Sequence, residues 1–376
     1  MPAGSGFCLR GSAVTDPLGT LGIDHIRLLV GNARQAAYYW QTVWGFTPIA
    51  YAGPETGNPD AVSYVLRQGS ATLVVTSAIC PETTTIAAHV ARHGDGVSDI
   101  AFAVVDATTA FDHAVRSWGP NGVGDVTELS DPDEGVVRIA AIRAYGDTVH
   151  SVVERREYHG LWAPGYKPLD GAPASQLPSL GVQAVDHANA VIPMGQTATW
   201  GDFYARVLGF SQLQQFGSEE VKVVMTKVVG DASGRIKLPL TEPVAGRARH
   251  VRDFLEAYGG PGVQHIAFLT DDIVASVYTL RARGMTFMST PRQYYEALPA
   301  RLDGLDHLRL DALAELGILV DQDDEGYLLQ VFTEPLGDRA TVFFELIERH
   351  GSRGFGARNI QALAEAAERA LATSSA

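Results

Sequence analysis

The chain has 376 residues, which is long for a single hydrophobic core and comfortable for two. Its formal net charge of −14 argues against a broad basic surface for nucleic acid. Two cysteines, Cys8 and Cys80, are too few for a disulfide framework and indicate a reducing compartment. No apolar run reaches the roughly 18 residues of a membrane helix, and residues 1–20 lack the features of a signal peptide. We therefore expect a cytoplasmic, non-membrane protein of two domains with a flexible tail at residues 1–20.

Two long stretches of the chain repeat one pattern of residues. Residues 22–46 and residues 184–210 each read as a short strand carrying Asp-His, an amphipathic helix with aromatic residues, and then Gly-Phe. Two further pairs match in the same order: GDGVSDIAF (94–102) with GPGVQHIAF (260–268), and TVHSVVER (148–155) with TVFFELIER (341–349) on the shared Glu-Arg. Three matched pairs in one order predict two copies of a single module.

The repeated unit reads as βαβββ and not as the alternating array of a parallel nucleotide-binding sheet. Its strands are short, and the helix follows the Asp-His strand. Residues 157–180, between the copies, contain four prolines and no periodicity, which predicts a linker. We expect an α+β protein with an N-terminal domain at residues 21–156 and a C-terminal domain at residues 181–376.

Comparison of the two copies singles out candidate metal ligands. The matched positions hold His25, Asp99 and Ser151 in the first copy, and His187, His265 and Glu345 in the second. Two imidazoles and one carboxylate leave three adjacent positions of an octahedral iron open, which suits Fe(II) oxygenases. A lone histidine in a strand is more often structural than a ligand. Glu345, however, lies in the apolar strand TVFFELIE, where an unpaired carboxylate is costly to bury. We predict an Fe(II) site in the second copy and a structural role for His25.

These residues and their surroundings resemble the 4-hydroxyphenylpyruvate dioxygenase and hydroxymandelate synthase family of the vicinal-oxygen-chelate superfamily. The similar stretches are VDH (185–187), GGPGVQHIAF (259–268), ELGILVDQDDEGYLLQVFTEP (315–335), DRATVFFELIERHG (338–351) and GFGARNIQAL (354–363). The resemblance spans about residues 20–370 and implies two tandem vicinal-oxygen-chelate modules, the first without metal. The second would form an open β-barrel around iron held by His187, His265 and Glu345, covered by a lid helix at residues 359–372. It also implies a homodimer or homotetramer.

What the resemblance implies chemically is the oxidative decarboxylation of an arylpyruvate by O2. The 2-oxo acid chelates Fe(II), carbon dioxide leaves, and the resulting arylacetate is hydroxylated. The dioxygenases hydroxylate the ring, whereas the synthases hydroxylate the benzylic carbon. Two alternatives stay open: the same chemistry on a different 2-oxo acid of specialised metabolism, and a non-catalytic binding protein of the same fold. The intact ligand set argues against the second.

The resemblance also implies a substrate pocket. Its members here are Gln330, Gln264, Phe332, Phe343, Thr226, Pro239, Thr241, His250, Asn359, Ile360 and Ala364. Gln330 and Phe332 are two residues apart in a strand and therefore share a face. Strict alternation aims Gln264 away from the metal, because it adjoins His265. Asn359 is expected to be the N-cap of the lid helix.

Several pocket positions depart from the family pattern. Thr226 and Thr241 stand where serine and asparagine are usual, and His250 stands at a glutamine position. Two amide side chains are thereby missing from the polar network around the substrate's 4-hydroxyl group. Pro239 matches the dioxygenases, Ile360 matches the synthases, and Ala364 matches neither. These differences leave open whether the substrate is 4-hydroxyphenylpyruvate or a larger or differently shaped 2-oxo acid.

Overall fold

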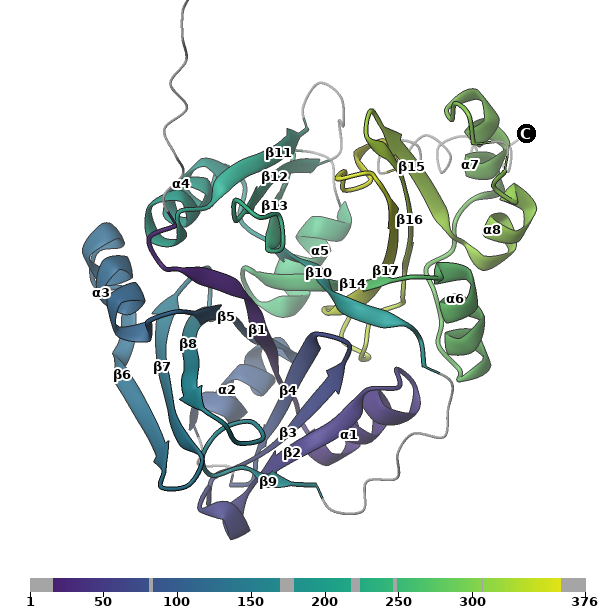
Figure 1. Cartoon of the computed structure of the whole chain (residues 1–376). Coiled ribbons are helices and arrows are strands. Elements are labelled where there is room, and N and C mark those ends of the chain that lie inside the picture. The colour runs from purple at the N-terminus through teal and green to yellow at the C-terminus, as the bar shows by residue number, and fades with distance from the viewer. Residues whose placement is uncertain are drawn as a thin grey trace, which may run out of the picture.

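The computed structural model describes residues 16–80, 84–169, 179–217, 224–245, 249–305 and 307–359. Its strands form two mixed sheets, one of nine strands in the N-terminal half and one of eight in the C-terminal half (Figure 1). Each sheet curls into an open half-barrel, and the two halves pack side by side. Among the described helices, none is both long and apolar enough to span a bilayer.

The N-terminal sheet has the strand order β6-β7-β8-β5-β1-β4-β3-β2-β9. Its strands are β1 (Thr20–Leu29), β2 (Thr47–Ala52), β3 (Ala61–Gln68), β4 (Ala71–Ala78), β5 (Gly96–Val104), β6 (Gly122–Asp131), β7 (Gly135–Arg143), β8 (Val149–Tyr158) and β9 (Lys167–Pro168). Its helices are α1 (Ala33–Thr42), α2 (Thr84–His93) and α3 (Ala107–Trp118), with a 3₁₀ turn at Pro54–Thr56.

The C-terminal sheet has the strand order β11-β12-β13-β10-β14-β17-β16-β15. Its strands are β10 (Val182–Val191), β11 (Ser211–Phe216), β12 (Val224–Gly230), β13 (Lys237–Pro243), β14 (Gly262–Thr270), β15 (Leu319–Asp323), β16 (Gly326–Phe332) and β17 (Phe343–His350). Its helices are α4 (Thr197–Leu208), α5 (Arg249–Tyr258), α6 (Ile273–Ala282), α7 (Arg292–Ala297) and α8 (Leu310–Leu316), with a 3₁₀ turn at Leu298–Ala300.

Both sheets use one pairing scheme. The first strand of each domain, β1 or β10, pairs antiparallel with β5 or β14 and parallel with β4 or β13. His25 lies opposite Ala101, and His187 lies opposite Ala267, with register shifts at the same places in both pairs. Each domain therefore contains two βαβββ units whose first strands lie side by side. The predicted repeat of a βαβββ module is confirmed.

Local sequence explains where several helices begin. Asn32, Asp106 and Asp272 precede α1, α3 and α6, and each side chain accepts a hydrogen bond from the backbone amide three residues later. Such caps satisfy amides that have no partner within the first turn of a helix. Several helices, among them α1, α3, α4 and α6, pack apolar residues into the main core with the sheets, whereas α2 and α5 lie on the open side of their half-barrels and line the cavities there.

An aromatic cluster joins the two domains. Trp40 and Trp44 of α1 and its following turn pack against Phe268 and Phe344 of the C-terminal sheet, with ring centroids 4.8 to 6.1 Å apart. All four side chains are fully buried. Phe344 directly precedes Glu345 in β17, so by strand alternation it packs on the opposite face of the sheet. The domain interface therefore supports the strands of the predicted metal site from behind.

A polar contact occupies the matching place in the N-terminal sheet. His150 of β8 aligns with Phe344 of β17, and it meets Tyr204 of α4 across the interface. Its Nδ1 donates to the carbonyl oxygen of Ile100 at 3.1 Å, and its Nε2 accepts from the Tyr204 hydroxyl at 2.7 Å. His150 is 1% exposed. Burial lowers the pKa of His150 to about 4, so the imidazole is neutral in the folded protein at neutral pH.

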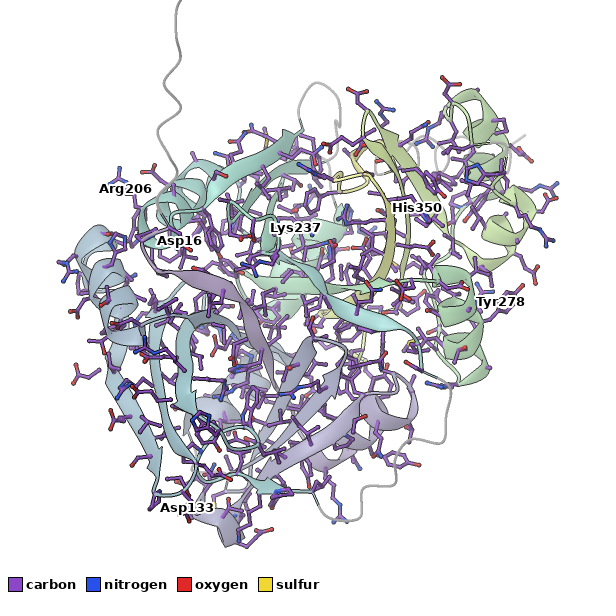
Figure 2. All side chains as sticks on the ribbon, in the orientation of Figure 1. Asp16, Asp133, Arg206, Lys237, Tyr278 and His350 are labelled. Atoms are coloured by element: carbon purple, nitrogen blue, oxygen red, sulfur yellow. The ribbon has the colours of Figure 1, made fainter. Side chains whose placement is uncertain are left out.

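The chain joins the fold before residue 20 and leaves the first domain after residue 156. Leu18 is buried and β1 begins at Thr20, with Asp16 (Figure 2) accepting bonds from both backbone amides. Beyond Tyr158, Trp162 is buried, and β9 pairs with β2. The fold therefore begins before the expected end of the tail at residue 20, and it continues past the expected start of the linker at residue 157. A single buried aromatic residue and a two-residue strand leave no periodicity by which the sequence could indicate the second boundary. Residues 170–178, and the expected lid helix beyond Asn359, lie outside the described residues.

The buried imidazole at the interface predicts acid-sensitive stability. An imidazole in the unfolded chain has a pKa near 6.5, against about 4 for folded His150. The stabilisation that neutral His150 gives is therefore present above pH 6.5 and is lost as the pH falls toward 4. Between pH 7 and pH 5 this group lowers the free energy of unfolding by about 2 kcal/mol. Denaturant titrations at both pH values measure it.

His150→Gln is the control for this experiment, because glutamine offers a donor and an acceptor but does not titrate. The difference in unfolding free energy between pH 7 and pH 5 should be smaller in the variant by about 2 kcal/mol. Equal pH dependence in both proteins would contradict the assigned role of His150.

Candidate metal centre

Three potential ligands meet on three adjacent strands of the C-terminal sheet. His187 lies on β10, His265 on β14 and Glu345 on β17, and the strands are neighbours in that order. Oε2 of Glu345 is 3.1 Å from Nε2 of His187 and 3.5 Å from Nε2 of His265. One ligand atom from each residue lies within 4.8 Å of the others. The structure thus brings together the three residues that the repeat comparison singled out.

The electrostatics of this cluster fit a bound cation. Glu345 is 2% exposed and its Oε2 faces imidazole nitrogens only. Burial alone would lower the pKa of His187, but the carboxylates of Glu345 and Asp186 raise it overall. Burial and the neighbouring His187 hold the pKa of His265 well below its ordinary value. The site therefore attracts one positive charge, and two imidazoles with one carboxylate form the donor set of facial Fe(II) centres.

A buried ion network fixes the orientation of His187. Its Nδ1 donates to Oδ1 of Asp186 at 2.8 Å, which turns Nε2 toward Glu345. Asp186 also accepts two bonds from Arg349, each 2.8 Å long, and one from Lys237 (Figure 2) at 3.1 Å. Burial would raise the pKa of Asp186, but its bonds to Arg349 and His187 hold it well below the usual range. Asp186 therefore remains an anion that supports the imidazole.

Arg349 also holds the segment that follows β17. It donates to the carbonyl oxygens of Ser352 at 3.1 Å and Gly354 at 2.7 Å. Phe355 then lies against the His187 ring, with centroids 5.4 Å apart. Gly356 adopts a positive φ of 69°, and a Cβ there would sit 2.5 Å from the amide of Gln330. Only glycine lets the chain pass this close to that side chain.

A cavity of about 390 Å³ opens in front of the three potential ligands. Of the residues predicted to bind substrate, those that line it are Gln330, Gln264, Phe332, Phe343, Thr226, Pro239, Thr241 and His250. The rings of Phe343 and Phe332 flank His265, with centroids 5.0 and 5.8 Å away. The volume lies within the range of small-molecule sites.

The cavity also has walls that the sequence reasoning missed: Asn189, Phe216, Val224, Val251, Met288 and Phe355. Asn189 is two residues after His187 in β10, so strand alternation alone places it on the same face. The other five residues lie far from the potential ligands in the sequence, so no sequence pattern indicates that they are close in space.

Gln264 lies in the cavity, contrary to the expectation from strict alternation. Asn189 pairs with His265, but the next residue of β10, Ala190, pairs with Val263. Gln264 is therefore the extra residue of a β-bulge, which re-aims its side chain to the face of His265. Its Oε1 accepts from Nδ2 of Asn189 at 3.5 Å.

Asn359 is not the N-cap that the sequence indicated. Residues 357–359 are already helical, and the Asn359 side chain is fully buried, accepting a 2.6 Å bond from the hydroxyl of Tyr294. It is absent from the walls of the described cavity. Asparagine favours caps, but here tertiary packing against Tyr294 decides its position. The predicted lid residues Ile360 and Ala364 lie outside the described residues.

Hydroxyl and amide groups form a chain along one wall. Thr241 donates to Oδ1 of Asn189 at 2.8 Å, and the Thr226 and Thr241 hydroxyls are 3.0 Å apart. Because Thr241 uses its only proton toward Asn189, Thr226 donates to Thr241. Asn189 in turn donates to Gln264. Gln330 stands apart, since its buried Oε1 has no hydrogen-bond partner among the described residues.

The matching positions of the N-terminal domain hold a different arrangement. His25 is buried and its Nδ1 bonds Oδ1 of Asp24 at 2.7 Å, as His187 does with Asp186. Both oxygens of Asp99 accept from Ser151, at 2.9 and 2.5 Å. Within the described residues, His187, His265 and Glu345 form the only group of three with metal-ligand spacing.

Comparison with known proteins agrees with both halves of the fold. Residues 14–163 match the family model for the N-terminal part of hydroxyphenylpyruvate dioxygenase, and residues 184–331 match the Glyoxalase/Bleomycin resistance protein/Dioxygenase superfamily. A 4-hydroxyphenylpyruvate dioxygenase of Caenorhabditis briggsae is 39% identical over 365 residues, covering 93% of this chain and 92% of its own. That of Aspergillus fumigatus is 40% identical over 375 residues, with coverages of 93% and 92%.

A solved structure extends the likeness to the arrangement of both domains. A triple mutant of 4-hydroxymandelate synthase from Streptomyces coelicolor superposes with a TM-score of 0.80 at 35% identity, covering 94% of this chain and 99% of that one. Similarity of this extent, over both glyoxalase-type domains, identifies an enzyme and not a binding protein of the same fold. The chain belongs to the 4-hydroxyphenylpyruvate dioxygenase family.

Proposed function

We propose that the protein is an Fe(II)-dependent oxygenase that oxidatively decarboxylates an arylpyruvate-type 2-oxo acid with O2 and hydroxylates the resulting arylacetate. The observation that carries this proposal is the buried cluster of His187, His265 and Glu345 at the base of an aromatic-walled cavity. The buried carboxylate of Glu345 raises the pKa of His187, so the cluster favours an added positive charge, which a bound cation would supply. The family assignment supports the same reaction class.

His187, His265 and Glu345 would hold the iron. Fe(II), when bound, supplies a Lewis-acid centre with open positions for a chelating 2-oxo acid and for O2. Two neutral imidazoles and one carboxylate cancel only one of its two positive charges. The remaining charge favours the carboxylate of the substrate, although the chain as a whole carries −14. A bound cation would therefore attract the anionic substrate to this site in spite of the net negative charge of the protein.

The cavity walls would orient the organic part of the substrate. Phe332 and Phe343 flank His265 and present apolar surface beside the metal position. An aryl ring packed against them would exclude water and face the centre where oxygen is delivered. Gln330 offers a buried acceptor without a hydrogen-bond partner in the described part of the chain, which a donor on the substrate would satisfy.

The same chemistry on another carbon or another substrate is the second candidate. The hydroxyls of Thr226 and Thr241 are already engaged with each other and with Asn189. A site whose polar groups are paired internally has less power to select a phenolic hydroxyl than one with free amides. We therefore keep benzylic hydroxylation, as in the related 4-hydroxymandelate synthase, and a different 2-oxo acid as alternatives.

We further propose a cytoplasmic homodimer or homotetramer. Cys80 is a free thiol, which supports a reducing compartment. The assembly follows from the family resemblance, and the N-terminal domain is the part of the chain that we expect to supply the contact between subunits.

Alanine substitution tests the ligand set. His187→Ala, His265→Ala and Glu345→Ala should each abolish stoichiometric Fe(II) binding and oxygen uptake, because each removes one of three ligands. Anaerobic metal analysis and an oxygen electrode measure both, and circular dichroism checks folding. His25→Ala is the matched control from the other domain and should keep its iron. Oxygen uptake by any of the three variants, or iron loss in the control, would overturn the assignment.

The ion network behind His187 predicts a graded effect. Asp186→Asn removes the anion that fixes the imidazole, so Fe(II) affinity should fall by roughly 10- to 100-fold. Asp24→Asn is the matched control, because Asp24 makes the equivalent contact to His25. Anaerobic titration calorimetry compares the two variants. Equal affinities in both would show that Asp186 does not act on the metal.

Product analysis separates the candidate reactions. Iron-loaded protein with O2 and 4-hydroxyphenylpyruvate should consume oxygen and release an equal amount of carbon dioxide. Mass spectrometry then distinguishes homogentisate from 4-hydroxymandelate, and a panel of larger 2-oxo acids tests for a different substrate. Absence of oxygen uptake with every 2-oxo acid of the panel would refute the proposed function.

A further inference from the structure

The N-terminal domain contains a second cavity, of about 780 Å³. It lies on the inner face of β1, β5, β7 and β8, and α2 forms another wall through residues such as Ile86 and His89. His25, Asp99 and Ser151 stand in it where the catalytic cavity has His187, His265 and Glu345. It is therefore the counterpart of the catalytic cavity, built on the same strands of the repeated module.

Strand register shows how this cavity was altered. Ala141 lies opposite Ser151 as Phe332 lies opposite Glu345, so alanine replaces an aromatic ring. By the same alignment of β8 with β17, Val149 replaces Phe343. Smaller side chains leave more room, which agrees with a volume of about 780 Å³ against about 390 Å³. No other described side chain of the domain fills this space.

Several polar groups in this cavity have no partner. The atoms concerned are Nε2 of His25, Nε of Arg27, Nε2 of His89 and Oγ1 of Thr148, all buried and without a hydrogen bond among the described residues. His25 is 3% exposed, His89 7% and Thr148 1%. Buried polar groups in native proteins are normally hydrogen-bonded, so a group of unpaired ones around one cavity indicates a missing ligand.

The charges around the cavity favour an anion. Arg27 replaces Asn189, since each lies opposite the matching residue of the next strand, Asp99 or His265. Arg27 makes no ion pair with any described residue, and Arg143 is exposed at the wall. Asp99 opposes them, but both of its oxygens accept bonds from Ser151.

The other charged groups and the potential metal ligands of this cavity leave its preference for an anion unchanged. Arg92 and Asp147 neutralise each other at 2.9 Å. A metal is disfavoured, because the described residues of this cavity contain no group of three potential ligands with metal-ligand spacing, and Asp99 already accepts two bonds. A small inorganic anion would leave the apolar part of the wall, formed by Ile86, Ile139 and Val149, without a contact.

We propose that the N-terminal cavity is a second ligand site that binds a small organic carboxylate with an apolar body. Its carboxylate lies at the Arg27 guanidinium, within reach of the imidazole nitrogens that lack partners. Its body packs against Ile86, Ile139 and Val149. This site is separate from the metal centre, so its existence does not depend on the proposed oxygenase reaction.

Binding of a non-chelating probe to metal-free, full-length protein tests the proposal. The probe is 3-phenylpropionate, and 3-phenylpropanamide is its uncharged match. Titration calorimetry should find binding of the acid and, because charge-assisted bonds are lost, about tenfold or weaker binding of the amide. Arg27→Gln should weaken binding of the acid by about tenfold or more for the same reason.

Two further variants locate the bound probe. Ala141→Phe restores a ring of the kind found at Phe332 and should block the cavity without changing charge. Arg67→Gln is the control, since Arg67 is exposed on β3 outside the cavity walls and carries the same charge. It should bind like the unmodified chain. Circular dichroism, and oxygen uptake after iron loading, show that each variant is folded.

Three results would overturn the proposal. The first is no binding of 3-phenylpropionate at millimolar concentration. The second is unchanged binding in both Arg27→Gln and Ala141→Phe, which would place the probe in the catalytic cavity. The third is equal affinity for acid and amide, which would exclude recognition of the carboxylate. Loss of binding in Ala141→Phe and Arg27→Gln, with retention in Arg67→Gln, supports it.

Discussion

The paired contact of Asp186 with Arg349 and His187 is the constraint on which the candidate metal centre depends. Asp186 is the extra residue of a β-bulge in β10, since Val185 pairs with Phe268 and His187 with the adjacent Ala267. The bulge lets neighbouring side chains meet, so that Asp186 accepts from His187. Two further bonds from Arg349 tie β10 to β17 across β14. These bonds thereby fix the spacing of the three strands that carry the potential ligands.

This contact also shapes the cavity beyond the ligands. Arg349 binds the backbone at Ser352 and Gly354, which directs the following residues across the open side of the half-barrel. Phe355 then packs on His187, and the missing Cβ of Gly356 leaves room for Gln330. A single buried guanidinium thus links the orientation of a potential ligand to the position of a cavity wall. Burial makes both ends of this network costly to leave unpaired.

The internal repeat and the period of the strands were enough to predict the module and the potential ligands. Features that depend on bulges, loops and tertiary packing could not be predicted from the sequence. Comparison of the two copies identified His187, His265 and Glu345 as candidate ligands. The first copy has Asp99 and Ser151 at the positions of His265 and Glu345 and therefore lacks the full set. Alternation misplaced Gln264, since a bulge shifts the phase of a strand without a signal in composition. Trp162, which anchors the end of the first domain, sits in a proline-rich segment that reads as a linker. Asn359 has the residue type of a cap, but Tyr294 determines where its side chain lies.

The two domains share one architecture, so a comparison between them shows which features of the site are specific to a potential metal centre. The N-terminal domain keeps the supporting contacts, with Arg155 and His25 on Asp24. An oriented imidazole is therefore part of the fold and does not by itself indicate a ligand. The difference lies in the next two strands. Asp99 and Ser151 satisfy each other through two hydrogen bonds, whereas Glu345 meets only imidazole nitrogens. A carboxylate that accepts two hydrogen bonds has no need of a cation, whereas Glu345 beside two imidazoles favours an added positive charge.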